Sequence, residues 1–146
     1  VPTLENARML LERVLEEGSA FEKFRLLIAA QGGDTSYVDD PGKFPKASLV
    51  KDVLSPQEGY LEQVNARTIG ECSVTLGAGR SRKDDRIDHT VGLIVHKRVG
   101  DFVKRGEPLL TVHAADQKAF VSVQETLLSA FSWSDRVVDP LPLFYS

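Results

Sequence analysis

Between two apolar segments the chain reads Leu76-Gly77-Ala78-Gly79-Arg80-Ser81-Arg82-Lys83-Asp84-Asp85-Arg86-Ile87-Asp88-His89. The two glycines allow positive φ angles and close backbone approach. The cations that follow are largely offset by three nearby carboxylates, those of Asp84, Asp85 and Asp88. Glycine amides and guanidinium groups are natural donors to an oxyanion, so the stretch is compatible with a loop that contacts phosphate. The alternative is an exposed connecting loop whose arginines pair with the aspartates.

Further blocks lie on both sides of this stretch. Downstream the chain reads Val99-Gly100-Asp101-Phe102-Val103-Lys104-Arg105-Gly106-Glu107-Pro108-Leu109 and then Val112-His113-Ala114. Upstream it reads Gly18-Ser19-Ala20-Phe21-Glu22-Lys23-Phe24, followed by Ala30-Gln31-Gly32-Gly33-Asp34. In this order and spacing the blocks resemble the C-terminal domain of pyrimidine nucleoside phosphorylases, the family that includes thymidine phosphorylase. The resemblance extends from about Leu11 to the C-terminus.

The resemblance implies an enzyme that uses inorganic phosphate as co-substrate, without a further cofactor, to release a pyrimidine base and a pentose 1-phosphate. It places the catalytic groups in other domains, so it implies no catalytic residue in this chain. It also implies an accessory cleft loop, which becomes ordered when the domains close and whose residues would be Gly77, Gly79, Arg80, Ser81, Arg82 and Lys83. The partners implied are the rest of the polypeptide, the nucleoside and, for the full-length enzyme, a second subunit in a homodimer.

Composition sets further limits on function. The 146 residues are 42% hydrophobic and 27% charged, as in a soluble globular domain, and a net charge of −3 argues against nucleic acid as a partner. Cys72 is the only cysteine, which suits a reducing, cytoplasmic compartment. No apolar run reaches membrane-spanning length, and no His or Cys spacing predicts a metal site. The chain opens at Val1-Pro2 without an initiator methionine, which we interpret as the middle of a longer protein.

Two helices are predicted in the first 34 residues. Leu4, Ala7, Leu11 and Leu15 recur at helical spacing after a Thr3 cap. Ser19-Ala20-Phe21-Glu22 has the form of a capping box, and the second helix is expected to stop at Gly32-Gly33. We assign residues 1–34 to the preceding α/β domain of the enzyme and residues 35–46, rich in Asp, Pro, Gly and Lys, to a linker.

Residues 47–146 are predicted to form the phosphorylase C-terminal α+β domain. Strands are expected at residues 48–54, 59–64, 91–96, 108–113 and 131–138, with helices at 66–76 and 116–130. We expect one mixed sheet with a crossover helix, similar to the hammerhead-like, barrel-sandwich-related domain of the phosphorylases.

A second function remains open at this point, a stand-alone carrier module of the biotinyl or lipoyl type. Residues 55–60 and 100–109 are similar to pieces of such domains. Against it, the chain has no Met-Lys-Met, and Lys97, Lys104 and Lys118 lack the setting of an attachment lysine. Cys72 lies on the apolar side of its helix and is expected to be a core residue.

Overall fold

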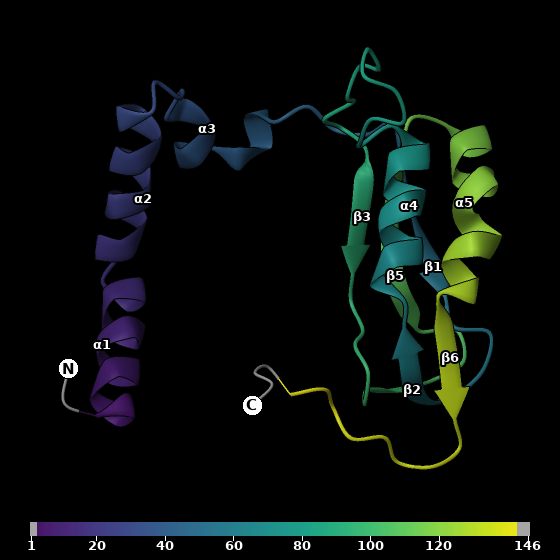
Figure 1. Ribbon diagram of the computed structural model, residues 1–146. Helices are drawn as coiled ribbons and strands as arrows, with labels where there is room; N and C mark the ends of the chain where they lie inside the picture. Colours follow the sequence, from purple (N-terminus) through teal and green to yellow (C-terminus); the bar gives the residue numbers. More distant parts are fainter. Residues whose placement is uncertain (1–2, 143–146) are drawn as a thin grey trace. The chain divides into compact units, whose positions relative to one another are not determined.

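The computed structural model describes residues 3–142, and the chain divides into two compact units, Val1–Phe44 and Pro45–Ser146 (Figure 1). The first unit is helical and contains α1 (Leu4–Glu16), α2 (Ser19–Ala30), α3 (Ser36–Asp39) and the 3-10 helix η1 (Pro41–Lys43). The second contains β1 (Leu49–Leu54), β2 (Gly59–Val64), α4 (Ala66–Leu76), β3 (Gly92–Val95), β4 (Phe102–Val103), β5 (Pro108–Ala114), α5 (Gln117–Ser129) and β6 (Phe131–Ser134).

The start of α1 follows its predicted cap, whereas the start of α2 does not. The Thr3 side chain accepts the Asn6 amide at 3.1 Å, as expected for an N-cap. The N-cap of α2 is Gly18, at φ 80°, and its carbonyl accepts the Glu22 amide. The Ser19 hydroxyl turns back and donates to the Glu17 carboxylate at 2.9 Å. The predicted capping box is therefore wrong, because the left-handed glycine moves the helix start one residue earlier.

Residues 35–46 contain more structure than the expected linker. Two short helical turns, α3 and η1, occupy most of the segment. The Asp40 carboxylate accepts the Gly42 amide at 3.0 Å and so stabilises η1. The assignment of residues 1–34 to a preceding α/β domain stays a prediction.

The second unit has two small sheets, each with three strands. Their orders are β1-β5-β3 and β4-β2-β6, and every pairing is antiparallel. The α+β class is confirmed, but the single mixed sheet is wrong, since β1 and β2 are adjacent in sequence yet pair in different sheets. Both sheets are open within the described residues, so no barrel is formed there. The last strand ends at Ser134, where the serine hydroxyl accepts the Arg136 amide in a turn.

The core lies between the sheets and two helices. Helix α5 contacts β1 and β5, α4 contacts β3, and the two helices pack side by side (Figure 1). Both helices begin at the expected places, with Asn65 and Asp116 as side-chain caps. Cys72 faces inward as predicted, together with Ile69 and Leu76 on α4, and the inward residues of α5 are Phe120, Val123 and Leu127. Alternate residues of β5, Leu110, Val112 and Ala114, are fully buried, as one covered face of a strand requires.

Ser55 lies where the chain passes from one sheet to the other, and it is 2% exposed. Its amide donates to Glu107 O and its carbonyl accepts the Gly106 amide. The indole Nε1 of Trp133, on β6, donates to the Ser55 hydroxyl at 3.1 Å, and this hydroxyl donates to Gln57 O at 2.6 Å. The serine thus bonds to the β4–β5 turn and to a strand of the second sheet.

Gly100 lies in the turn before β4, and this turn requires a glycine. Its φ is 92°, and a side chain there would lie 2.9 Å from Pro140 N and 3.0 Å from Val138 O. The backbone amide of Gly100 donates to Leu61 O on β2. The turn, β2 and the segment around residue 140 therefore meet at a point that has no room for a Cβ atom.

We predict that Gly100→Ala lowers the free energy of unfolding by about 1–3 kcal/mol, because alanine would be strained at this φ and would clash with the backbone near Pro140. Urea unfolding followed by the fluorescence of Trp133, the only tryptophan, measures the change.

Gly70→Ala is the matched control. Gly70 lies in the middle of α4, and no neighbouring atom lies within 4 Å of the place that an alanine methyl group would occupy. Alanine should therefore stabilise the helix by about 0.5–1 kcal/mol. Equal effects of the two substitutions would contradict the role assigned to Gly100.

Candidate functional site

The loop of residues 77–91 is anchored at its two ends. Gly77 caps α4 at φ 105°, and its amide donates to Val74 O. Across the base, the Asp88 amide donates to Gly77 O at 2.9 Å. Val91 at the far end is buried in the core. A side chain at Gly79 would come within 2.8 Å of Val74 Cγ2, so this glycine also permits close packing on α4.

The aspartates of the loop bind its own backbone. The Asp85 carboxylate accepts the amides of Ser81 and Arg82, at 3.0 and 2.7 Å. The Asp88 carboxylate accepts both the hydroxyl and the amide of Thr90. These bonds, with a smaller contribution from His89, hold the pKa of Asp88 below its usual value. The two carboxylates therefore shape the loop.

The cations of the loop have no carboxylate partner among residues 3–142. No ion pair of the described chain includes the side chains of Arg80, Arg82, Lys83 or Arg86, and all four residues are exposed. The expected pairing of these arginines with Asp84, Asp85 and Asp88 is wrong for the described residues, where Asp85 and Asp88 accept backbone and hydroxyl groups instead. Whether the loop is only a connector is a separate question.

The six residues predicted for the cleft loop fall into two groups. Gly77 and Gly79 form the base, while residues 80–83 lie at the exposed tip. Of these, Ser81 and Arg82 are held in position by the Asp85 carboxylate. The tip thus presents cationic donors to solvent, which is an arrangement suited to an anion that approaches from solvent. That these residues contact a substrate stays a prediction.

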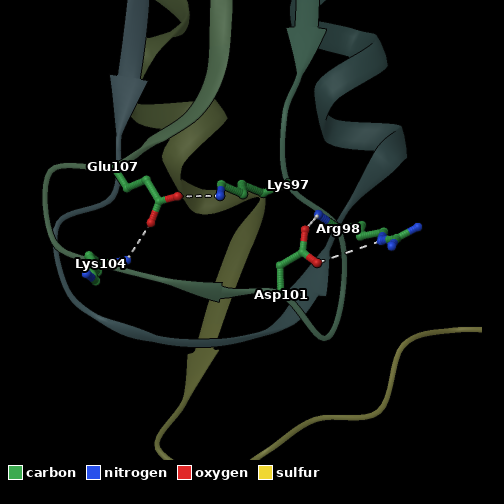
Figure 2. Close-up of polar contacts among 5 residues, drawn as sticks. All are labelled: Lys97, Arg98, Asp101, Lys104 and Glu107. Carbon is green, nitrogen blue, oxygen red and sulfur yellow. Dashed lines mark hydrogen bonds and ion pairs between the residues drawn. The ribbon is translucent and has the colours of Figure 1, made fainter.

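A second polar cluster lies at the other end of β3, and sequence reasoning missed it (Figure 2). The Lys97 ammonium pairs with Glu107 Oε1, while Glu107 Oε2 accepts the Lys104 amide at 2.9 Å. Asp101 Oδ2 accepts the Arg98 amide at 2.9 Å, and its other oxygen lies 3.7 Å from Arg98 Nε. Lys97 is the first cause of a lowered pKa of Glu107, and the Lys104 amide adds to it.

Next to this cluster, a chain of hydrogen bonds crosses the first sheet. The Thr111 hydroxyl, on β5, donates to Asp52 Oδ1 on β1 at 2.6 Å. The Thr111 hydroxyl oxygen also lies 2.7 Å from Nε2 of His96, the residue that follows β3. Because a hydroxyl has one proton and Thr111 gives it to Asp52, His96 must donate from Nε2. No sequence signal predicts this chain of hydrogen bonds, since its three residues lie far apart in sequence.

Two shallow hollows, of about 310 and 510 Å³, flank the segment of His96 and Lys97. Their polar groups already have partners: the Lys97 ammonium pairs with Glu107, and the Thr111 hydroxyl donates its proton to Asp52. Neither is therefore a free nucleophile. The polar cluster around Lys97 and Glu107 stabilises the end of the first sheet, and we assign it a structural role.

The remaining candidate residues do not gather into a site. Cys72 is 3% exposed and burial raises the pKa of its thiol, which confirms it as a core residue. Within residues 3–142, no group of three or more His, Cys, Asp or Glu side chains is arranged to hold a metal ion. The helices of the same residues are too short or too polar to cross a membrane.

Comparison with known sequences bears on this arrangement. Residues 60–134 match the family described as "Pyrimidine nucleoside phosphorylase C-terminal domain". The chain belongs to this family. It is 44% identical over 112 residues to a pyrimidine-nucleoside phosphorylase of Geobacillus stearothermophilus, and 46% identical to one of Bacillus subtilis, in each case over 77% of the chain and 26% of the relative. A Staphylococcus aureus pyrimidine-nucleoside phosphorylase is 40% identical over 138 residues, 94% of the chain and 32% of the relative.

The family match confirms the resemblance to the phosphorylase C-terminal domain. The alternative of a stand-alone carrier module is not favoured. The chain spans about a quarter to a third of the length of these relatives. Of the lysines weighed for a carrier, Lys97 has a structural setting here, since its ammonium is ion-paired with Glu107.

Glu107→Gln is predicted to destabilise the domain in a pH-dependent way. Because the folded-state pKa of Glu107 lies below its ordinary value, its stabilising effect is present above the pKa of an unfolded glutamate, about 4.3, and is lost as the pH falls through the folded-state pKa. The wild-type chain should thus unfold at higher urea than the variant at pH 7, and the gap should close on acidification.

Glu125→Gln removes a comparable charge from the exposed side of α5, where Glu125 makes no ion pair within the described residues. The urea midpoint of this control should match wild type throughout. A Glu107→Gln gap that persists unchanged at pH 3 would show that the lost contact is not ionic.

Proposed function

We propose that this chain is the C-terminal part of a longer pyrimidine nucleoside phosphorylase. The full-length enzyme would use inorganic phosphate to displace the base of a pyrimidine nucleoside, giving the free base and a pentose 1-phosphate. The observation that carries the proposal is the family match over residues 60–134 together with relatives named pyrimidine-nucleoside phosphorylase at 40–46% identity. Phosphate is a co-substrate in this proposal, and the enzyme takes no other cofactor.

Within that enzyme, the loop of residues 77–91 serves as an accessory element at the substrate cleft. Its anchored base allows the tip to move without disturbing α4 or β3. Its guanidinium groups, which make no ion pair among residues 3–142, can donate to an anionic substrate or to a carboxylate on the opposite side of the cleft. Closure of such a loop excludes water, which strengthens the electrostatic interactions around the reacting groups.

The catalytic groups lie outside this chain in the proposal. Glycosyl transfer to phosphate needs an oriented phosphate, a held sugar and stabilisation of charge on the departing base. The loop supplies donors for one part of this task. The partners are the rest of the polypeptide, the nucleoside and a second subunit of a homodimer. The compartment is cytoplasmic, which the single buried cysteine supports.

The isolated 146-residue chain is predicted to be inactive. A purified sample, incubated with thymidine or uridine and phosphate, should release no base above the level of a buffer blank. The full-length enzyme under the same conditions is the positive control. Phosphorolysis by the isolated chain would place the catalytic groups here and would overturn this part of the proposal.

In the full-length enzyme, Arg80→Ala with Arg82→Ala should lower turnover about tenfold, equivalent to about 1.4 kcal/mol, because closure over the substrate weakens. Thermal unfolding should be unchanged, since neither guanidinium has an ion-pair partner among residues 3–142.

Arg98→Ala with Arg105→Ala removes the same charge from the other end of β3, where the Arg98 side chain is 82% exposed. This matched control should keep wild-type kinetics. If both double variants behave like wild type in turnover and KM, the loop is a simple connector.

A further inference from the structure

The loop of residues 77–91 joins α4 to β3 and extends past the end of the helix (Figure 1). Its three aspartates have different surroundings. The Asp84 side chain is exposed, and no hydrogen bond or ion pair within residues 3–142 includes it. Asp88 acts at the base, where its carboxylate accepts the amide and the hydroxyl of the threonine two residues further on. Asp85 is half-buried and binds the tip.

A single carboxylate oxygen organises this tip. Asp85 Oδ2 accepts the Ser81 amide at 3.0 Å and the Arg82 amide at 2.7 Å. The Asp85 amide in turn donates to Arg82 O at 3.1 Å, which closes a turn over residues 82–85. Hydrogen bonds to an ionised carboxylate are stronger than those between neutral groups. The bonds of this one aspartate therefore determine the backbone path of residues 81–85.

The same bonds decide which groups of the tip can bind an anion. Successive backbone amides that point to one spot form a natural anion site. Here Asp85 Oδ2 fills that spot, so the amides of Ser81 and Arg82 are not available to a ligand. The side chains of Arg80 and Arg82 are free of ion pairs within residues 3–142. The donors that the tip offers are thus side chains, and their position depends on the turn that carries them.

We propose that Asp85 is the positioning residue of this loop, because its carboxylate forms the turn from which Arg80 and Arg82 enter the substrate cleft when the loop closes. This inference rests on the proposed function of the loop. A turn that exists before closure has less conformational entropy to lose than a disordered segment, which favours the closed state. In this role Asp85 acts only through the two arginines.

The kinetic test compares three substitutions in the full-length enzyme. Asp85→Ala removes the acceptor of both amides. Asp85→Asn removes the same charge but keeps a carbonyl oxygen, and one oxygen accepts both amides in the structure. Asp84→Ala is the matched control, since it removes a neighbouring carboxylate that makes no hydrogen bond or ion pair within the described residues.

We expect Asp85→Ala to lower turnover about three- to tenfold, because misplaced groups contribute less to catalysis, and by no more than the loss of both arginine side chains does. Asp85→Asn should retain at least about half of the wild-type turnover, since its amide oxygen can take the place of the carboxylate oxygen. Asp84→Ala should match wild type. The thermal midpoints of all three variants should equal that of the wild-type enzyme.

A double-mutant cycle separates positioning from a general structural effect. In the enzyme that already carries Arg80→Ala and Arg82→Ala, the further substitution Asp85→Ala should cause no additional loss of turnover, because the side chains through which it acts are gone. A role in the structure of the domain alone would lower turnover in both backgrounds.

Amide hydrogen exchange gives a readout that does not depend on catalysis. In peptides of the full-length protein that cover residues 77–91, Asp85→Ala should speed exchange at least about threefold, because the Ser81 and Arg82 amides lose their acceptor. Asp85→Asn and Asp84→Ala should exchange like wild type. A wild-type protein without phosphorolysis would refute the proposed function, and the exchange rates would still decide whether Asp85 holds the tip.

Four results would overturn the inference. Asp85→Ala could leave turnover and exchange at wild-type values. Asp85→Asn could lose as much turnover as Asp85→Ala, which would mean that the charge of the carboxylate is what matters. The losses in the double-mutant cycle could add. Finally, a lower KM for phosphate in Asp85→Ala would show that the freed amides bind the anion and that the carboxylate competes with it.

Discussion

A buried hydroxyl without a hydrogen-bond partner costs about 1–3 kcal/mol. The hydroxyl of Ser55 is buried at the point where the chain passes from one sheet to the other. Ser55 meets this constraint with four bonds, two through its backbone to residues 106 and 107 and two through its hydroxyl to Trp133 and Gln57. The bonds fix the end of β1 relative to β6 and to the turn before β5. Both sheets can then share one core under α4 and α5.

Sequence reasoning succeeded where the signal is local. The bounds of β2 and α4 are the predicted ones, because a proline turn, an Asn65 cap and Gly77 mark their ends. The inward residues of α5, Phe120, Val123 and Leu127, recur at helical spacing, which is the local signal for such a helix. The family was also identifiable, since its blocks occur in a fixed order around the loop of residues 77–91.

The errors and omissions concern contacts between distant residues. Alternation of apolar and polar residues indicates that β2 is a strand, but it does not say that β1 and β2 pair in different sheets. The chain of Asp52, Thr111 and His96 depends on that pairing, so it could not be foreseen. At the loop, charge counting suggested pairs between arginines and aspartates. The backbone amides of Ser81 and Arg82 competed for the Asp85 carboxylate instead.

The buried thiol of Cys72 has a practical consequence. It is the only cysteine of the chain, it sits on the inward side of α4, and burial raises its pKa, so a thiol reagent reaches it only when α4 leaves the core. The rate at which a thiol reagent labels Cys72 therefore measures how often α4 separates from the core of the second unit. A new cysteine at an exposed position such as Ser81 would react under native conditions, which gives two separable signals from a single polypeptide.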